Sequence, residues 1–511
     1  MSTGDSTYKL PEGWIWTTIG EIGIVTSGGT PSTKNSEFWN GDIPWVTPAD
    51  LSNYRNVYIE KGLRNISDIG MEYSSAKLLP KGSILFSSRA PIGYVAIAKN
   101  ELATNQGFKN IIPTPSLFSE YVFYYLKTIK PLAEKMASGT TFLELSASKF
   151  AKLPIPLPPL SEQQRIVSKI EEVFSELDHS ESNLKKAQKQ LEIYRHSLLK
   201  SAFEEKNYVR LSEIADVITK GASPKWQGIN YTENSNDVLF ITSENIRNNY
   251  IDIVKKKYVE KRFNQIQSRS ILQKGDVLLN IVGASIGRAA FFDLNISANI
   301  NQAVALIRPL INFKYLTFFL NSPIAIDYYG KRMVNVARAN LSLKDVAEML
   351  IPYCSEEKQN IVVQELESKF TLIEHLEYTI KTGLHKIEIF RQSVLKRTFE
   401  GKLINQDSID EPALLLIKRI QNEKQIYLKN QDSIEQQKPK RKTTMEKSNL
   451  SVKEVLAIQS EAISAKNIWK QSKYQNDLDI DQFYAELKDL ENFIEIRFNE
   501  KETLISWKNE N

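Results

Sequence analysis

Residues 191–206, LEIYRHSLLKSAFEEK, return 196 residues later as IEIFRQSVLKRTFEGK at residues 387–402. Other segments repeat in the same order at offsets of 193–196 residues: 44–51 with 239–246, 79–98 with 272–292, and the Asn-Gln pair 105–106 with 301–302. Self-similarity at a fixed period indicates a duplicated architecture. The chain is therefore predicted to be a tandem duplication with units of about 195 residues.

Each repeat unit begins with a globular part, roughly residues 10–160 and 208–353, that is rich in Gly, Pro, Thr and aromatic residues. Short apolar runs such as residues 82–86 and 275–279 are typical of strands between turns, which predicts a mixed α/β domain. Proline then ends each part, at residues 156–159 and at Pro352. In the first unit Ser161 to Gln164 follow, a polar and acidic start that favours a helix N-terminus.

A long helix is predicted after each globular part, because apolar residues recur there every seven positions. The recurring residues are Ile170, Leu177, Leu184, Leu191 and Leu198 in the first helix and Leu366, Ile373, Ile380, Ile387 and Val394 in the second, with Tyr194, Leu376 and Phe390 among the interleaved positions. Five heptads in register predict a coiled coil. The alternative is an amphipathic helix that lies on its own domain. A helix over residues 161–205 would be about 68 Å long at 1.5 Å per residue.

These patterns predict an α+β fold with two mixed α/β domains, two long helices that pack antiparallel, and pseudo-two-fold symmetry. The expected boundaries are residues 1–160 and 207–354 for the domains, 161–206 and 355–405 for the helices, 406–450 for a linker and 451–511 for a small helical C-terminal extension. The linker is expected because residues 421–449 are rich in Lys, Gln and Asn. The extension is expected to be helical because Val452, Val455, Leu456 and Ile463, and then Phe483, Leu487, Leu490 and Ile494, follow helical spacing.

The charge of the chain lies mainly on its globular domains. The formal net charge of 66 Lys and Arg against 61 Asp and Glu is only +5, which argues against a polycation. By segment it is +2 over residues 1–160, −1 over 161–206, +6 over 207–352, zero over 353–405 and −2 over 406–511. The densest basic run, residues 255–257 with 261–262, is either a solvated loop or a surface that faces nucleic acid.

The sequence carries no recognisable catalytic or metal motif. It has no phosphate-binding Gly-x-x-x-x-Gly-Lys-Ser/Thr loop and no Gly-x-Gly-x-x-Gly after a predicted strand. Its one cysteine and four histidines do not form a zinc cluster, and no signal peptide or membrane span is evident. We therefore expect a cytoplasmic binding protein with no catalytic residues, no metal and no cofactor of its own.

The chain resembles the DNA-specificity subunits of type I restriction-modification systems. The matching motifs, over about residues 8–420, are residues 10–14 (LPEGW), 27–31 (SGGTP) with 221–224 (GASP), 81–83 (KGS) with 274–276 (KGD), the two Asn-Gln pairs, 155–163 (IPLPPLSEQ), 399–403 (FEGKL) and 410–413 (DEPA). No single motif is decisive, but their order and duplication make the combination specific. The chain departs from the family pattern in its tail, because such chains often end soon after the position of Lys402.

The resemblance implies how such a chain would work. Two target-recognition domains would each enter the major groove at one half of a bipartite site on double-stranded DNA, and the helix pair would set an unread spacer between the half-sites. The family also implies two modification subunits, which methylate adenine with S-adenosylmethionine, and two restriction subunits, which use ATP and Mg²⁺. The extension is expected to bind another subunit. Alternatives are a standalone DNA-binding or scaffold protein and, less favoured, an enzyme with its own endonuclease site.

Candidate DNA-binding residues are polar or basic side chains in predicted loops of the two domains. They are Lys34, Arg89, Gln106, Lys109 and Thr140 in the first domain and Lys220, Lys225, Trp226, Lys255, Lys256, Arg288, Gln302 and Arg338 in the second. Each has a surface or structural role as its alternative. The repeated glycines and Asn-Gln pairs are expected to be architectural, because a feature that two domains share cannot explain how they read different sequences. Arg338 differs from its counterpart segment, residues 140–142.

Overall fold

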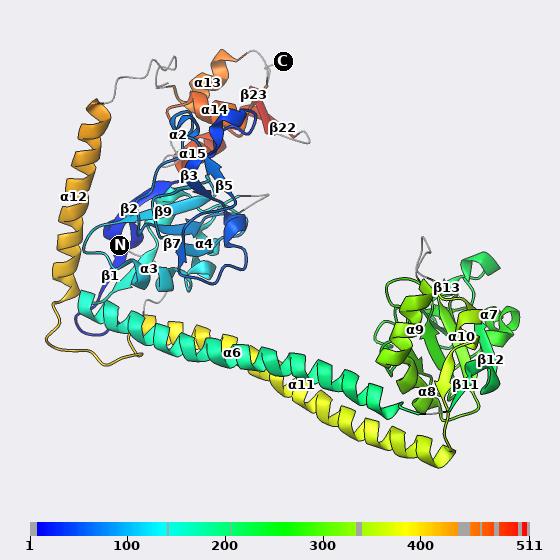
Figure 1. The fold of residues 1–511 in the computed structure, drawn as a ribbon. Coiled ribbons are helices and arrows are strands. Elements are labelled where there is room, and N and C mark those ends of the chain that lie inside the picture. Colours follow the sequence, from blue (N-terminus) through cyan, green and yellow to red (C-terminus); the bar gives the residue numbers. More distant parts are fainter. Residues whose placement is uncertain are drawn as a thin grey trace. The chain divides into compact units, whose positions relative to one another are not determined.

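The structure is a computed structural model that describes residues 8–139, 143–205, 207–333, 340–437, 450–459, 462–474, 480–498 and 503–507. Its contacts divide the chain into two compact units, residues 1–178 with 387–511 and residues 179–386 (Figure 1). Each unit holds one α/β domain and parts of the long helices α6 (Leu160–Ala202) and α11 (Glu356–Phe399). Among the described helices, none is both long and apolar enough to cross a membrane.

The first α/β domain has a five-stranded sheet, β2-β9-β6-β7-β4, a three-stranded sheet, β5-β3-β8, and the pair β1-β10. Its strands are β1 (Ile15–Thr18), β2 (Gly23–Ser27), β3 (Trp39–Val46), β4 (Tyr58–Ile59), β5 (Arg64–Ile66), β6 (Ile84–Ser87), β7 (Val95–Ala98), β8 (Ala103–Thr104), β9 (Phe108–Pro113) and β10 (Pro154–Leu157). Its helices are α1 (Ile19–Ile22), α2 (Asp68–Glu72), α3 (Ser119–Leu126), α4 (Lys130–Met136) and α5 (Ala147–Ala151). The aromatic helix α3 is buried in the core, where the Tyr121 hydroxyl donates to the Pro156 carbonyl at 2.7 Å.

The second α/β domain repeats this plan with sheets β12-β19-β16-β17 and β13-β15-β14-β18 and the pair β11-β20. Its strands are β11 (Tyr208–Arg210), β12 (Ala215–Lys220), β13 (Tyr231–Thr232), β14 (Val238–Ile241), β15 (Tyr258–Val259), β16 (Val277–Asn280), β17 (Ala289–Phe291), β18 (Ala298–Ile300), β19 (Val304–Pro309) and β20 (Leu350–Pro352). Its helices are α7 (Arg262–Ile266), α8 (Phe313–Leu320), α9 (Pro323–Met333) and α10 (Leu343–Ala347). Strand β14 runs parallel to β18 as β3 does to β8, so the predicted duplication is confirmed.

The two long helices form the predicted seam. All ten heptad residues named above are buried or half-buried, whereas the interleaved Tyr194, Leu376 and Phe390 are exposed. In the first unit Arg391 Nη2 of α11 lies 2.6 Å from Asp178 Oδ1 of α6. In the second unit Arg195 Nη2 of α6 lies 3.2 Å from Glu377 Oε1 of α11. A later part of each helix thus meets an earlier part of the other, which confirms the antiparallel arrangement.

The segment expected as a linker, residues 406–450, instead contains a helix, α12 (Ala413–Gln437). Its buried face packs against the first domain through Ala413, Leu416, Ile417 and Ile420. The Glu423 carboxylate accepts from the Ser116 backbone N–H at 3.0 Å and from the Ser116 hydroxyl at 2.6 Å. The linker prediction was wrong for residues 413–437. It was based on the polar composition after residue 421 and did not take account of the apolar stripe over residues 413–420. Residues 438–449 lie outside the described part of the chain.

The C-terminal extension is not purely helical as predicted. Helices α13 (Val452–Ile458), α14 (Ala465–Gln471) and α15 (Ile480–Asp489) accompany strands β21 (Ile463–Ser464), β22 (Ile494–Phe498) and β23 (Thr503–Trp507), which form an antiparallel sheet in the order β21-β23-β22. Ile463 and Ile494, which we counted in the helical pattern, lie in strands. The error arose because helical and strand spacings coincide over short apolar runs.

Candidate nucleic-acid interface

Four loop segments of the first domain meet at the turn formed by residues 105–107. The Asn105 side-chain oxygen accepts from the Gly107 backbone N–H at 2.9 Å, and the Asn105 N–H donates to the Val46 carbonyl at 2.9 Å. The Ser88 N–H donates to the Gly107 carbonyl at 2.8 Å, and the Leu145 N–H donates to the Ser88 carbonyl at 3.0 Å. We call residues 46–50, 88–89, 105–107 and 144–145 the first loop junction.

The second domain contains the same arrangement. The Asn301 side-chain oxygen accepts from the Ala303 N–H at 3.2 Å, and the Asn301 N–H donates to the Ile241 carbonyl at 3.0 Å. The Ile281 N–H donates to the Ala303 carbonyl at 2.9 Å, and the Leu341 N–H donates to the Ile281 carbonyl at 2.9 Å. Residues 241–245, 281–282, 301–303 and 340–341 form the second loop junction.

The repeated glycines allow other backbone to approach these turns. A Cβ atom at Gly28 would lie 2.0 Å from the Asn105 carbonyl oxygen, and one at Gly221 would lie 1.8 Å from the Ile300 carbonyl oxygen. Both contacts are too short for any side chain. The repeated glycines and the asparagines of the Asn-Gln pairs thus hold the loops together, whereas Gln106 and Gln302 are exposed at the centre of their junctions.

Charged side chains gather at the first junction. Glu144 Oε2 lies 3.2 Å from Arg89 Nη1, and Glu144 Oε1 lies 3.8 Å from Lys109 Nζ. The Lys109 side chain is only 4% exposed, while that of Glu144 is 40% exposed. A buried ammonium group requires a partner charge because desolvation disfavours it. Lys109 therefore pairs with Glu144 on the buried side of this carboxylate. Glu144 and the Arg89 guanidinium, which is about one third exposed, remain accessible to solvent.

The second junction is neutral at the same positions. Ala305 of β19 takes the place of Lys109 of β9, since each pairs with the equivalent strand of its sheet. Asn340 takes the place of Glu144 and is bridged to Val282, as Glu144 is to Arg89. Near them the Asn280 amide donates to the Ser285 hydroxyl at 3.0 Å. The two domains therefore share a backbone scaffold but present different side-chain chemistry.

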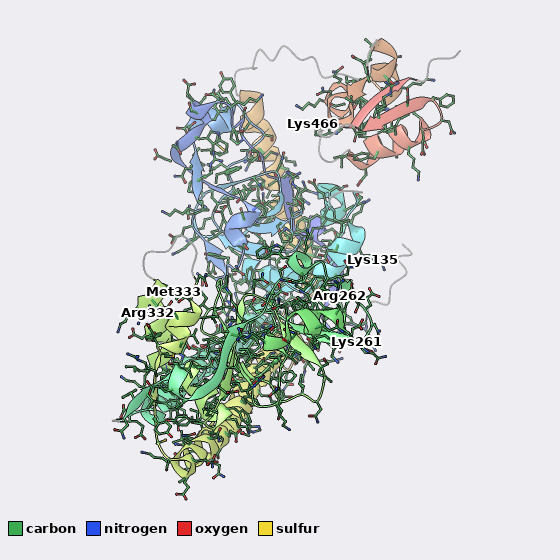
Figure 2. The ribbon with its side chains drawn as sticks, turned by 90° about the vertical axis from the view of Figure 1, so that its right-hand side faces the viewer. Lys135, Lys261, Arg262, Arg332, Met333 and Lys466 are labelled. Atoms are coloured by element: carbon green, nitrogen blue, oxygen red, sulfur yellow. The ribbon has the colours of Figure 1, made fainter. Side chains whose placement is uncertain are left out.

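Along the chain, α4 precedes the last segment of the first junction, and α9 precedes the last segment of the second. Lys135 belongs to α4, and Arg332 and Met333 end α9; all three are labelled in Figure 2. The loop after α4 is closed at its base, where Ser138 and Glu144 exchange two backbone hydrogen bonds at 3.0 and 2.9 Å. Thr140 and Arg338, both predicted DNA-binding residues, lie outside the described residues.

The structure brings some of the other predicted residues to the junctions and leaves the rest apart. Arg89, Gln106 and Lys109 lie at the first junction, and Gln302 lies at the second. Lys220 directly precedes Gly221, which approaches the Ile300 carbonyl oxygen. The Arg288 carbonyl accepts from the Asn280 N–H at 2.9 Å. Exposed residues away from the described junction contacts are Lys34, Lys225, Trp226, Lys255 and Lys256. Trp226 is notable because its side chain is 82% exposed.

Glu144, Asn280 and Asn340 were missed by the sequence analysis. Glu144 and Asn340 are distant in sequence from Arg89 and Val282, to which they are bridged, so no local pattern marks them. The duplication does contain a signal, because Glu144 and Asn340 are 196 residues apart, the offset of the repeat. An acid and an amide at equivalent positions of two domains with the same scaffold indicate a difference in what each domain contacts.

Within the described residues, no cluster of three or more His, Cys, Asp or Glu side chains could hold a metal ion. Two related domains with matching scaffolds, different junction side chains and long antiparallel helices define a tandemly duplicated protein. The chain belongs to the type I restriction modification DNA specificity domain family, whose model matches residues 11–188 and 204–388.

Individual relatives support this assignment. The MjaIX specificity subunit of Methanocaldococcus jannaschii is 44% identical over 229 residues, which is 43% of this chain and 52% of that protein. The EcoKI specificity subunit of Escherichia coli K12 is 21% identical over 81% of this chain and 94% of its own length. The chain thus spans about half the length of the M. jannaschii relative and nearly all of the E. coli one.

Solved structures share the fold. A chain from a study of complex assembly and conformational transition of the type I R-M system matches with a TM-score of 0.64 and 21% identity, over 78% of this chain and 100% of that one. The HsdS subunit of Thermoanaerobacter tengcongensis matches with a TM-score of 0.50 and 21% identity, over 78% of this chain and 99% of that one.

Proposed function

We propose that this chain is the DNA-recognition subunit of a type I restriction-modification complex and that each α/β domain reads one half of a bipartite target through its loop junction. The proposal is supported by the pair of junctions, which have the same backbone hydrogen bonds but different exposed side chains. Two surfaces on one scaffold suit two different half-sites. The shared scaffold determines how each domain docks on DNA, and the side chains determine which bases it contacts.

The chemistry of the first junction favours a G·C base pair. Arginine makes paired hydrogen bonds to guanine O6 and N7, and a carboxylate accepts from the cytosine amino group. Arg89 and Glu144 offer both groups side by side, and the buried Lys109 keeps the carboxylate in place. In the second domain Asn340 offers an amide, the side-chain group that pairs with adenine.

The remaining basic residues contribute through the DNA backbone. The first domain carries a net charge of +2 and the second +6. Lysine and arginine contacts to phosphate raise affinity without reading sequence and make it fall with salt. We therefore assign Lys34, Lys220, Lys225, Lys255, Lys256 and Arg288 to phosphate contacts, so binding by the second domain should depend more strongly on salt.

The helix pair acts as the spacer between the half-sites. Helix α6 is continuous over 43 residues and α11 over 44, which corresponds to about 65 Å at 1.5 Å per residue. Successive major grooves on one face of DNA are about 34 Å apart, within the reach of such a helix pair. A rigid seam of buried heptad residues would keep the spacer constant.

The chemical steps belong to partner subunits in this proposal. Modification subunits would bind S-adenosylmethionine and methylate adenine, and restriction subunits would use ATP and Mg²⁺. This chain would supply the docking surfaces and the sequence information from the cytoplasm.

The test is a selection from a randomised duplex library with the purified chain, alone and together with its modification subunits. We expect the assembled complex to enrich a motif with two specified blocks and an unspecified gap of constant length. Enrichment of one contiguous block would contradict the proposal. Full sequence selectivity by the chain alone, unchanged by the modification subunits, would favour a standalone DNA-binding protein instead.

A further inference from the structure

Arg64 lies at the same end of its sheet as the first loop junction. It begins β5 and pairs across the antiparallel ladder with Trp45, the residue before Val46 of the junction (Figure 1). Strand β3 in turn runs parallel to β8, which leads directly into the turn at residues 105–107. The strand order β5-β3-β8 therefore places Arg64 two strand spacings, or about 10 Å, from that turn.

The backbone beside Arg64 is tied to the junction. The Asp50 carboxylate accepts from the Leu63 N–H at 2.9 Å and from the Thr47 N–H at 2.7 Å. These two bonds connect the start of β5 to the junction segment 46–50. Arg64 therefore stands on backbone whose position is fixed relative to the junction.

Arg64 and Glu144 lie at opposite ends of this row of segments. Hydrogen bonds join neighbouring segments in the order 64, 45–46, 105–107, 88–89 and 144–145. Successive base pairs of DNA are about 3.4 Å apart along a strand. A duplex that lies along the row would therefore meet Arg64 and Glu144 at different base pairs.

An aromatic ring orients the Arg64 guanidinium. Arg64 is exposed, and its Cζ lies 3.6 Å from the centroid of the Trp39 ring. The Trp39 indole is itself held, since its Nε1 donates to the Ser32 carbonyl at 3.1 Å. Among the described residues, no carboxylate forms an ion pair with Arg64. A stacked guanidinium of this kind can still present the N–H groups at its edge to an acceptor in the same plane.

The other arginines that lie over aromatic rings in the described part of the chain are all paired with a carboxylate. They are Arg195 with Glu377, Arg332 with Asp345 and Arg391 with Asp178. In each of them a carboxylate of the chain occupies part of the donor edge. Arg64 differs from these three because its stacked guanidinium has no such partner among the described residues.

The second domain has a different cation at the equivalent position. Phe240 corresponds to Trp45 in the repeat, and its N–H donates to the Lys257 carbonyl at 2.8 Å. Lys257 Nζ lies 3.1 Å from Glu244 Oε2, so this ammonium group is already paired. An ammonium group also lacks the two parallel N–H donors of a guanidinium. The two domains thus differ here in chemistry on a shared scaffold, which favours a role in specificity over a common phosphate contact.

We propose that Arg64 reads a guanine of the first half-site and that Trp39 holds its guanidinium in the reading orientation. The inference deepens the proposed function and rests on it, because it adds a second specificity-determining position to the first domain. Paired hydrogen bonds from arginine to guanine O6 and N7 are the commonest specific contact in the major groove. They need a guanidinium whose plane is fixed and whose edge is available, and Arg64 meets both conditions.

The test uses the full-length chain assembled with its modification subunits, in a selection from a randomised duplex library. Arg64→Lys keeps the positive charge and removes the paired donors, while Arg64→Ala removes the charge as well. Lys257→Ala is the matched control, because it removes the cation at the equivalent position of the second domain. Titrations with duplexes altered at single base pairs then measure discrimination, and thermal melting followed by circular dichroism verifies that each variant is folded.

We expect both Arg64 variants to relax one G·C pair of the first half-site, with discrimination at that pair falling roughly tenfold or more. The relaxed pair should differ from the pair that Glu144→Gln affects, and the second half-site and the gap should not change. Lys257→Ala should leave the first half-site intact.

An unchanged motif in both Arg64 variants would overturn the inference. If their affinity for all duplexes fell uniformly, Arg64 would be a phosphate contact instead. Relaxation of the second half-site, or of the pair that Glu144→Gln affects, would overturn the inference as well. None of these results would affect the proposed function, which fails only if the original complex selects no bipartite sequence.

Discussion

At the scale of single residues, the two loop junctions differ in charge. Arg89, Lys109 and Glu144 form an ionic cluster in the first domain, and Ala305 and Asn340 replace two of its members in the second. The buried ammonium group of Lys109 fixes the carboxylate that solvent reaches. A change at Glu144 should therefore alter what the first domain reads, and it should also lower the free energy of unfolding of that domain, because it removes a charge with which the buried Lys109 pairs.

Glu144→Gln should change the first half-site and leave the second half-site intact. The amide keeps one acceptor oxygen but loses the negative charge that strengthens the bond from a cytosine amino group, so discrimination at one base pair should fall by about 1–3 kcal/mol, or roughly tenfold or more. The measurement is sequencing of methylated sites in cells that carry the variant. Glu134→Gln is the control, because Glu134 pairs with Lys130 on the surface of α4. A change in both half-sites, or in neither, would refute the assignment.

Combined replacement of Gln106 and Gln302 by alanine should have the opposite effect. Both glutamines are exposed at equivalent points of the junctions, so we expect them to make a contact that the two half-sites share. We expect the affinity for every target duplex to fall by about tenfold, which corresponds to about 1.4 kcal/mol of binding free energy. The methylated motif should stay the same. Titrations with cognate and mismatched duplexes provide the measurement, and a shifted motif would show that the glutamines read sequence.

At the scale of elements, the long periodic helices were predictable and the short or isolated ones were not. The heptad pattern identified α6 and α11 because an apolar stripe repeated over five heptads favours a long paired helix over an amphipathic helix that lies on its own domain. Helix α12 was missed because only its first two turns carry the buried stripe and the rest is polar. The loop junctions could not be predicted, since they bring together residues that lie up to a hundred positions apart.

Ile420→Ala should destabilise the first unit. Ile420 is fully buried where α12 packs on the first domain, so its truncation leaves a cavity and costs about 2–5 kcal/mol. Urea denaturation followed by circular dichroism measures the change in the free energy of unfolding. Ile426→Ala, on an exposed position of the same helix, should cost less than about 0.5 kcal/mol. Equal effects of the two variants would mean that α12 is not packed on the domain.

The ion pair between Arg165 and Asp410 should make the stability of the first unit depend on pH. Arg165 Nη2 lies 2.5 Å from Asp410 Oδ2, and this hydrogen bond lowers the pKa of Asp410 below its usual value. The stabilisation is therefore present above about pH 4, the ordinary pKa of aspartate, and is lost as the pH falls through the lower pKa of the folded state.

Asp410→Asn should reduce the unfolding free energy by up to about 1 kcal/mol at neutral pH and have less effect at low pH. Melting temperatures measured between pH 3 and pH 7 test this expectation. Glu411→Gln, next along the chain in an exposed pair with Arg419, is the control. A difference in melting temperature between the Asp410→Asn variant and the original chain that grows toward low pH would contradict the assignment.

At the scale of the whole molecule, duplication accounts for the main features of the chain. One α/β scaffold is used twice, each copy is followed by a long helix, and the helices pack antiparallel. The side chains at the junctions differ between the copies, and the second long helix is followed by α12 and the C-terminal extension. Under the proposed function, this duplicated fold would provide two recognition surfaces of related geometry and separate specificity.

The central claim is that two domains of one chain specify a bipartite target, and sequencing of methylated adenines in the genome of the host tests it most directly. The comparison is between cells that carry the gene and cells that lack it. We predict one motif that depends on the gene, with two specified half-sites separated by an unread gap of fixed length. A contiguous motif, a gap of variable length, or a methylation pattern that does not change when the gene is removed would contradict the account.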